Sequence, residues 1–274
     1  MSFIWLSACT PLSEFGYQTA SNSGTPVLNV GGIGDLYRDK EIERVNVMVV
    51  HGMGGFPRER FEDLSDHIAG ALGAGNCKSR VITITQKGGF DPGDGADRAC
   101  PQNDKKAATE IANAATGQVH LRQYKSASSD KTINFYLVNW SFSVTPLKDD
   151  LLNIDEQDWI QDLRVKPFTN LAKLDFMNDR VADAFLYTGI KTDDINHVID
   201  TTAKQIVKHS SDQNHRNAVI AISLGSAIVN NSIELGFEPR IQRLVPDFNA
   251  NLCRVYLLAN QIPLLQLGQE TRTI

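Results

Sequence analysis

The chain has 274 residues, a formal net charge of −5 and 22% charged residues, which argues against the basic surface that nucleic-acid binding requires. Its apolar content of 42% is typical of a globular protein, and its length predicts one large domain or a domain with an elaborated insertion. No run of about 18 apolar residues occurs, so the sequence encodes no membrane-spanning helix.

The first residues, MSFIWLSACTPLSE, contain a pattern of small residues before a cysteine. Leu6-Ser7-Ala8-Cys9 resembles the lipobox of bacterial lipoproteins, in which the cysteine sulfur receives a diacylglycerol. A signal peptide also needs a basic start and about 7 to 15 apolar residues, whereas no Lys or Arg precedes Cys9. Either the natural start lies upstream, which predicts a lipid-anchored protein of the bacterial cell envelope, or the match is a coincidence, which predicts a cytoplasmic protein.

The segment after Cys9 is rich in turn-forming residues and has no helical stripe of apolar residues. This composition predicts a poorly ordered tether between an anchor and a folded unit. We therefore assign residues 1–40 to the lipobox-like segment and flexible tether, and residues 41–274 to a single domain.

The predicted domain begins with a strand, a glycine-rich turn and a helix. Residues 45–50 form an almost continuous apolar run, as expected of a strand that is covered on both faces. The run ends at His51, where the glycine-rich turn begins. Apolar residues then recur at helical spacing from Phe61 to Leu72, and Gly73 marks the end of the helix. This order is the first half of a βαβ unit.

Four further apolar stretches predict strands, at residues 80–85, 133–140, 218–222 and 254–258. The residues between them predict a long loop at 86–106, a short helix at 106–117 and a helical insertion at about 141–210. The alternation of strands and helices predicts an α/β domain with a mostly parallel central sheet and helices on both faces. Trp140 and Ser141 lie at the end of one predicted strand, where they line a cleft unless Trp140 fills the core.

Three cysteines lie within the predicted domain. Cys77 and Cys100 flank the predicted long loop; in an oxidising compartment they can form a disulfide, and otherwise they are two unrelated thiols. The sequence leaves these two alternatives open. Cys253 begins an apolar run, which predicts a thiol in the core.

The stretch NAVIAISLGSAIV places a single serine between an apolar strand and a helix. Ala221-Ile222-Ser223-Leu224-Gly225 matches the nucleophile elbow Gly-x-Ser-x-Gly, except that Ala221 replaces the first glycine. The outer positions must be small because strand and helix nearly touch across the tight turn. Such a turn lifts the Ser223 hydroxyl off the sheet edge and aims the Leu224 N–H at the site.

A second motif, His51-Gly52-Met53-Gly54-Gly55, follows the first predicted strand. At the end of an internal strand, a loop this rich in glycine can aim backbone N–H groups into a cleft. In an acyl-transfer site, one such donor combines with the N–H after the nucleophile to form an oxyanion hole. The plainer interpretation is a strand–helix turn that needs glycine for its positive φ angles.

Because the histidine–glycine loop precedes the serine turn, the chain resembles the α/β-hydrolase superfamily in its lipase and esterase branch. The resemblance covers residues 45–258 in organisation and is closest to a bacterial envelope hydrolase with a helical insertion. It implies that Ser223 is the nucleophile and that the N–H groups of Met53 and Leu224 form the oxyanion hole. The implied substrate is a small-molecule or lipid ester, without a cofactor or a metal ion. Three residues would support the motifs: His51, Gly52 and Gly225.

The chain departs from this family in the position of its histidines. The resemblance places the catalytic histidine after the last strand, yet all six histidines precede Ser223. Three explanations follow: the chain is truncated, it is an inactive relative that kept the turn, or the base has moved to His51. The first two describe an incomplete or inactive hydrolase. The alternative function is therefore a non-catalytic, envelope-anchored lipoprotein with a hydrolase-like fold.

Overall fold

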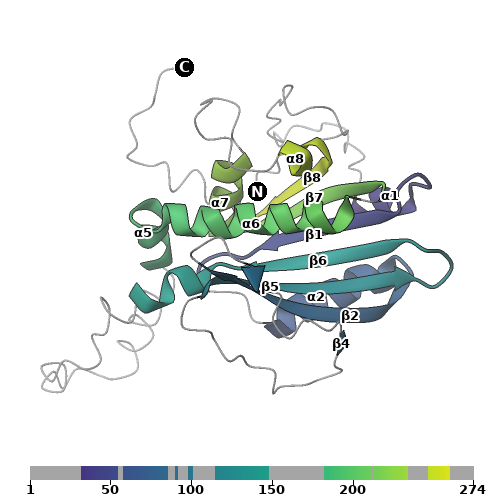
Figure 1. Cartoon of the computed structure of the whole chain (residues 1–274), viewed down its shortest axis with the longest axis horizontal. Helices are drawn as coiled ribbons and strands as arrows, with labels where there is room; N and C mark the ends of the chain where they lie inside the picture. The colour runs from purple at the N-terminus through teal and green to yellow at the C-terminus, as the bar shows by residue number, and fades with distance from the viewer. Residues whose placement is uncertain are drawn as a thin grey trace, which may run out of the picture.

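The computed structural model describes residues 32–54, 58–85, 90–91, 98–100, 115–147, 182–211, 213–233 and 246–259. Within these ranges the chain forms an α/β fold, in which helices cover both faces of a mixed sheet (Figure 1). The helices are α1 (Ile33–Arg38), α2 (Arg58–Ala71), α5 (Ala182–Thr188), α6 (Thr192–Ser210), α7 (Leu224–Ile233) and α8 (Pro246–Ala250), with a 3₁₀ turn η2 (Ser141–Ser143). The strands are β1 (Arg44–Val50), β2 (Ala74–Thr85), β3 (Phe90–Asp91), β4 (Arg98–Ala99), β5 (Ala115–Ser126), β6 (Thr132–Asn139), β7 (His215–Ile222) and β8 (Leu252–Leu258).

The strands are arranged in the order β3-β2-β5-β6-β1-β7-β8, and β4 pairs with β2 beside this path. The neighbours β6, β1, β7 and β8 are parallel, whereas β5 is antiparallel to both β6 and β2. Among the six long strands described, β5 therefore runs against the other five. The prediction of an α/β fold with a mostly parallel sheet is confirmed, and each of the five predicted strands overlaps an observed one.

The strand β5 differs from the sequence-based prediction, which expected a helix at 106–117 and no strand beyond it. The strand begins at Ala115, and residues 106–114 lie outside the described residues. The row of β5 that faces α2 is polar, and two of its members, Arg122 and Tyr124, are buried by hydrogen bonds to that helix. Because this row is polar, the sequence of β5 lacks the clear apolar alternation that predicts a strand. The partners that allow these polar side chains to be buried lie on α2, far away in the sequence.

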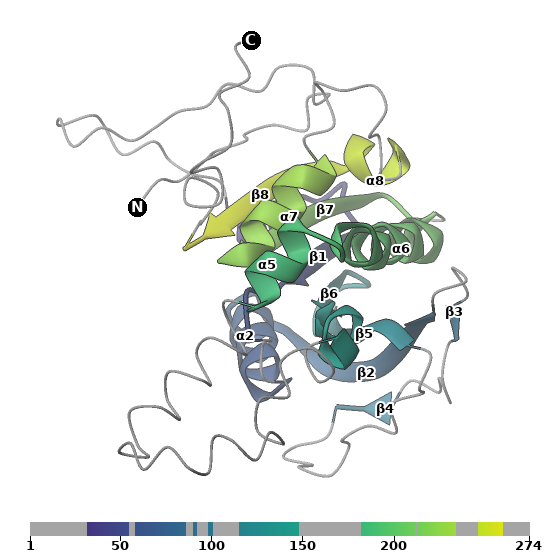
Figure 2. The same cartoon turned by 90° about the vertical axis from the view of Figure 1, so that its left-hand side faces the viewer.

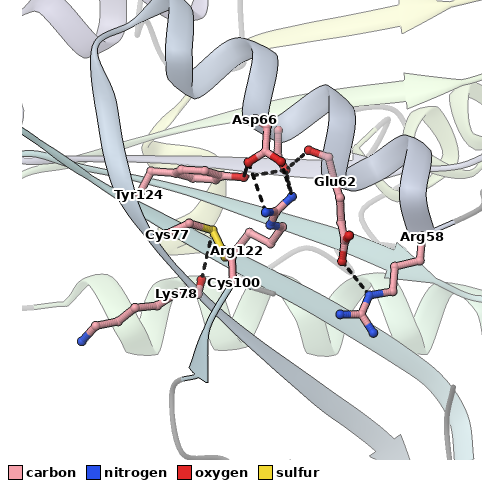
Figure 3. Close-up of a disulfide and its surroundings, with 9 residues drawn as sticks. Arg58, Glu62, Asp66, Cys77, Lys78, Cys100, Arg122 and Tyr124 are labelled. Carbon is pink, nitrogen blue, oxygen red and sulfur yellow. Dashed lines mark hydrogen bonds and ion pairs between the residues drawn. A yellow bond between two sulfur atoms is a disulfide. The ribbon is translucent and has the colours of Figure 1, made fainter. Parts of the chain in front are cut away.

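Figure 3 shows how Arg122 and Tyr124 hold α2 on the sheet beside a disulfide. The Arg122 guanidinium lies 3.1 Å from a carboxylate oxygen of Asp66, and the Tyr124 hydroxyl donates to Asp66 at 2.7 Å. Cys77 on β2 is bonded to Cys100, so the disulfide alternative for this pair is the one observed. Cys253 is buried, but no cysteine in the described part of the chain is a free thiol, so the prediction of a core thiol is wrong.

The sheet separates two apolar layers. On one side α5, α6, α7 and α8 pack over a core that includes Trp140 and Met48. On the other side α1 and α2 pack over a core that includes Val47 and Phe135. Figure 2 shows α6 and α7 over one face of the sheet and α2 beyond its other side. The predicted covering of both faces is thus confirmed for the described helices.

The structure moves one predicted boundary. Residues 33–38 were assigned to the tether, but they form α1, whose Leu36 and Tyr37 are buried against the sheet. The folded unit therefore begins earlier than residue 41. Cys9 and the rest of the predicted tether up to residue 31 lie outside the described residues. The predicted helical insertion contributes η2, α5 and α6, and its residues 148–181 also lie outside them.

Three buried asparagines lie at one level across the parallel strands. Asn134 of β6, Asn46 of β1 and Asn217 of β7 are register partners. Asn134 donates to Asn46 at 3.1 Å, and Asn46 donates to both Asn217 and Ser210 at 3.0 Å. Since a buried amide without a partner is costly, a one-residue shift of any of these strands would leave polar groups unpaired. The ladder therefore favours a single register.

Replacing both Cys77 and Cys100 by Ser should lower the free energy of unfolding by about 3 kcal/mol, because the cross-link closes a 23-residue separation and restricts the unfolded chain. Urea unfolding of the two proteins without reductant measures the difference. Identical free energies of unfolding would contradict a native Cys77–Cys100 bond.

Candidate active site

Ser223 is the single residue between β7 and α7. Its φ angle is +54°, a left-handed backbone conformation that residues other than glycine rarely adopt. Such strain persists only where the surrounding structure enforces it, and it gathers at functional sites. Ser223 is partly exposed, whereas Ala221 and Leu224 on either side of the turn are buried. This strained strand-to-helix turn with an accessible serine has the geometry of a nucleophile elbow.

Backbone hydrogen bonds hold the turn in place. The Ser223 N–H donates to the Leu258 carbonyl at the end of β8, at 2.8 Å, and the Ser226 N–H donates to the Ser223 carbonyl at 2.9 Å. The Ser226 hydroxyl donates to the carbonyl of Ala221 at 3.2 Å. The strand β8 and the first turn of α7 thus fix the backbone on both sides of the Ser223 side chain.

Each motif contains a glycine that lies against the backbone or side chain of the neighbouring segment. A Cβ atom at Gly225 would lie 2.4 Å from the Val50 carbonyl oxygen and 2.6 Å from that of His51. A Cβ atom at Gly52 would lie 2.7 Å from the Ser223 Cβ and 3.2 Å from its hydroxyl oxygen. A small residue at position 225 is predicted from the sequence because β7 and its own helix nearly touch. In the structure, the closest atoms to a Cβ at this position belong to the end of β1 and to His51.

The glycine loop leaves the same sheet edge as the serine turn, because Val50 pairs with Ala221 in the parallel register of β1 and β7. Gly54 has a φ angle of +73°, which explains a glycine there. Neither the Met53 N–H nor the Leu224 N–H donates a hydrogen bond to the described part of the chain. Both predicted oxyanion donors therefore retain the capacity to bind an acceptor. Gly55 lies outside the described residues.

His51 is fully buried, and its ring contacts groups other than Ser223. Its Nδ1 lies 2.7 Å from the Gly52 carbonyl oxygen, so Nδ1 carries the proton and Nε2 accepts from the Ser141 hydroxyl at 3.4 Å. The ring stacks on Trp140 with centroids 4.8 Å apart, and the Trp140 indole N–H donates to the His51 carbonyl at 3.1 Å. Trp140 thus belongs to the core, while Ser141 is partly exposed.

Burial is the main reason why the pKa of His51 is lowered to about 4; hydrogen bonds to Gly52 and Asn139 act in the opposite direction. The imidazole is therefore neutral at physiological pH. A neutral imidazole has the protonation state of a general base. In His51, however, the unprotonated Nε2 accepts from the Ser141 hydroxyl and not from Ser223.

All six histidines lie in the described ranges, and none forms a hydrogen bond with the Ser223 hydroxyl. His215 is the first residue of the eight-residue strand β7, whereas Ser223 follows the last. His209 lies at the amino end of β1, because Arg44 donates to its carbonyl. The pKa of His120 is lowered to about 4, first by burial and then by the charge of Arg58. The site therefore contains a serine and nearby backbone N–H groups, but no histidine that forms a hydrogen bond with the serine hydroxyl.

One residue of this site was not predicted. Asp183, in the first turn of α5, is buried, and its carboxylate accepts the Gly54 N–H at 2.7 Å. No local pattern marks it, since an acidic residue early in a helix is common on any protein surface. Its position becomes informative only when α5 is placed beside the glycine loop.

No family model, no curated protein and no solved structure matches this chain. Among the described residues, no group of three or more His, Cys, Asp or Glu side chains is arranged to hold a metal ion. No helix of the described part is long and apolar enough to cross a membrane.

Replacing Gly225 by Ala should lower the free energy of unfolding by about 2 kcal/mol, because the new methyl group would force the end of β1 away from α7. The matched control is Gly70→Ala, on the exposed face of α2, where a Cβ meets nothing within 4 Å. That change should be neutral or stabilising, since alanine favours helix. Urea unfolding measures both, and equal effects at the two positions would contradict the close contact at Gly225.

Proposed function

We propose that this chain is a serine hydrolase-like protein of the esterase and lipase class, with Ser223 as its nucleophile and a small-molecule or lipid ester as its substrate. The observation that carries the proposal is the left-handed backbone of Ser223 at a strand-to-helix turn. Its partial exposure and the close approach of Gly52 support the same role.

The proposed chemistry uses the two ends of neighbouring strands. The Ser223 oxygen adds to the ester carbonyl carbon, and the N–H groups of Met53 and Leu224 donate to the oxygen that becomes negative. A general base accepts the serine proton and passes it to the departing alcohol. The same base then accepts a proton from the water that attacks the acyl–serine ester and returns it to the Ser223 oxygen as the acid leaves.

The absence of a histidine at the Ser223 hydroxyl favours a second candidate function, a non-catalytic envelope protein with a hydrolase-like fold. A serine hydroxyl is a poor nucleophile at neutral pH unless a base assists it. Loss of one triad member costs factors of about 10⁴ to 10⁶ in turnover. The two functions therefore differ in whether Ser223 reacts with an electrophile at all.

A fluorophosphonate probe should label the wild-type protein slowly at Ser223, because no histidine assists the hydroxyl. Added imidazole should accelerate this labelling by about tenfold or more, since it supplies the base from solution. Mass spectrometry of the labelled peptides and the time course of labelling, with and without imidazole, provide the measurement.

Two variants sharpen this experiment. Ser223→Ala should abolish the imidazole-dependent labelling, whereas Ser141→Ala should keep it, because Ser141 is a second partly exposed serine near His51. No labelling of Ser223 even with imidazole would overturn the hydrolase proposal in favour of the non-catalytic function. Fast labelling without imidazole would indicate a base within the protein, and its loss in His51→Ala would identify that base.

The disulfide bears on the compartment in which the protein works. The bond between Cys77 and Cys100 favours an oxidising environment such as the bacterial cell envelope. The lipobox-like Leu6-Ser7-Ala8-Cys9 supports the same location, with a lipid anchor as the contact to the membrane. A cytoplasmic location would leave the disulfide unexplained.

With its upstream sequence present, the protein should carry a thioether-linked lipid on Cys9. Incorporation of a palmitate analogue in a bacterial host, lost in Cys9→Ala and kept in Ser7→Ala, would support the anchor. Peptide mapping tests the anchor directly, because a Cys9 sulfur that carries diacylglycerol cannot also form a disulfide. Recovery of Cys9 in a disulfide-linked peptide would refute the anchor.

A further inference from the structure

A buried carboxylate lies beside the glycine loop of the candidate site. Asp183 is 1% exposed, and its Oδ2 accepts the N–H of Gly54 at 2.7 Å. A buried carboxylate needs hydrogen-bond partners, and the N–H of the glycine loop is one partner that the fold provides for Asp183.

The amide that Asp183 holds adjoins the proposed oxyanion donor. Gly54 has a φ angle of +73°, and its N–H belongs to the peptide that follows Met53. Fixing this peptide restricts rotation at Met53, whose own N–H makes no hydrogen bond within the described ranges. Of two successive amides, the carboxylate occupies one and leaves the other for an acceptor.

The helix that carries Asp183 also contacts the serine turn's own helix. Tyr187, 2% exposed and one turn after Asp183 on α5, accepts a hydrogen bond from the Asn231 side chain of α7 at 2.7 Å. Figure 2 shows α5 beside α7, which begins directly after Ser223. The helix α5 is therefore bonded to the glycine loop at one end and to the nucleophile's helix at the other.

We propose that Asp183 is a positioning residue of the Ser223 site, which fixes the Met53–Gly54 peptide so that the Met53 N–H points toward the acyl oxygen. This inference rests on the proposed function, and it adds a side chain from the helical insertion to the two sequence motifs. Asp183 does not contact the reacting atoms in this scheme; it acts through the loop.

The test compares Asp183→Ala with Asp183→Asn, whose amide oxygen can still accept the Gly54 N–H. The control is Asp194→Ala, which removes a carboxylate paired with Lys191 at 2.7 Å near the start of α6. Two readouts are used on the full chain: hydrogen exchange of the Gly54 amide by NMR, and the rate of Ser223 labelling by the fluorophosphonate probe with imidazole present.

In Asp183→Ala, exchange of the Gly54 amide should rise by about tenfold or more, and Ser223 labelling should slow by about tenfold, as for a weakened oxyanion donor. Asp183→Asn and the control should stay near wild type in both readouts. A positioning role is overturned if Asp183→Ala, shown to be folded by its NMR spectrum, keeps wild-type exchange or wild-type labelling. It is also overturned if Asp183→Asn, the variant most conservative for folding, shows the same slow Ser223 labelling and the same fast amide exchange as Asp183→Ala.

The two proposals fail in different ways. If the wild-type chain shows no Ser223 labelling even with imidazole, the proposed function fails. If the wild type labels and only the Asp183 comparison shows no effect, the hydrolase proposal stands and Asp183 has no positioning role.

Discussion

The candidate site depends on one close contact, between the carboxyl end of β1 and the turn from β7 to α7. Gly225 gives the β1 carbonyls room against α7, and Gly52 gives the Ser223 side chain room against the loop after β1. Each motif therefore contains the glycine that the other requires. A Cβ at either position would come within 2.7 Å of an atom of the partner motif, closer than packed atoms tolerate. The glycine loop and the serine turn are neighbours because these two backbones touch.

This contact needs a fixed strand register as well as small residues. Gly52 meets Ser223 because Val50 is paired with Ala221, and a shift of one residue would displace the glycine by about 3.3 Å along the strand. The apolar runs of β1 and β7 define their register weakly, because both faces of each strand are buried. The asparagines at positions 46, 134 and 217 define the register more strictly, because their amides can form hydrogen bonds with one another only when the three residues lie at the same level. A polar ladder in the core thus aligns a site at the sheet edge.

The sequence predicted the parallel strands, the serine turn and the glycine loop, because each is recorded in a short local pattern. It did not predict β5 or Asp183, whose roles depend on distant partners. Two buried polar residues of β5, Arg122 and Tyr124, form hydrogen bonds with Ser65 and Asp66 of α2. Asp183 meets Gly54 across 129 positions of sequence. The helix α1 was missed because six residues are too few for a periodic pattern.

The geometry also explains how such a site can hold the proposed oxyanion donors although no histidine forms a hydrogen bond with Ser223. The donors are backbone groups, and their placement follows from register, two glycines and the strained turn, all of which also determine the fold. A base is a single side chain that the fold does not need. His51 illustrates the difference, because stacking on Trp140 and bonding to Gly52 give it a structural place in the core. Burial keeps it neutral, and its accepting nitrogen faces Ser141. The serine turn and a proton acceptor for its hydroxyl are therefore physically separable, because the fold fixes the turn and does not require the acceptor.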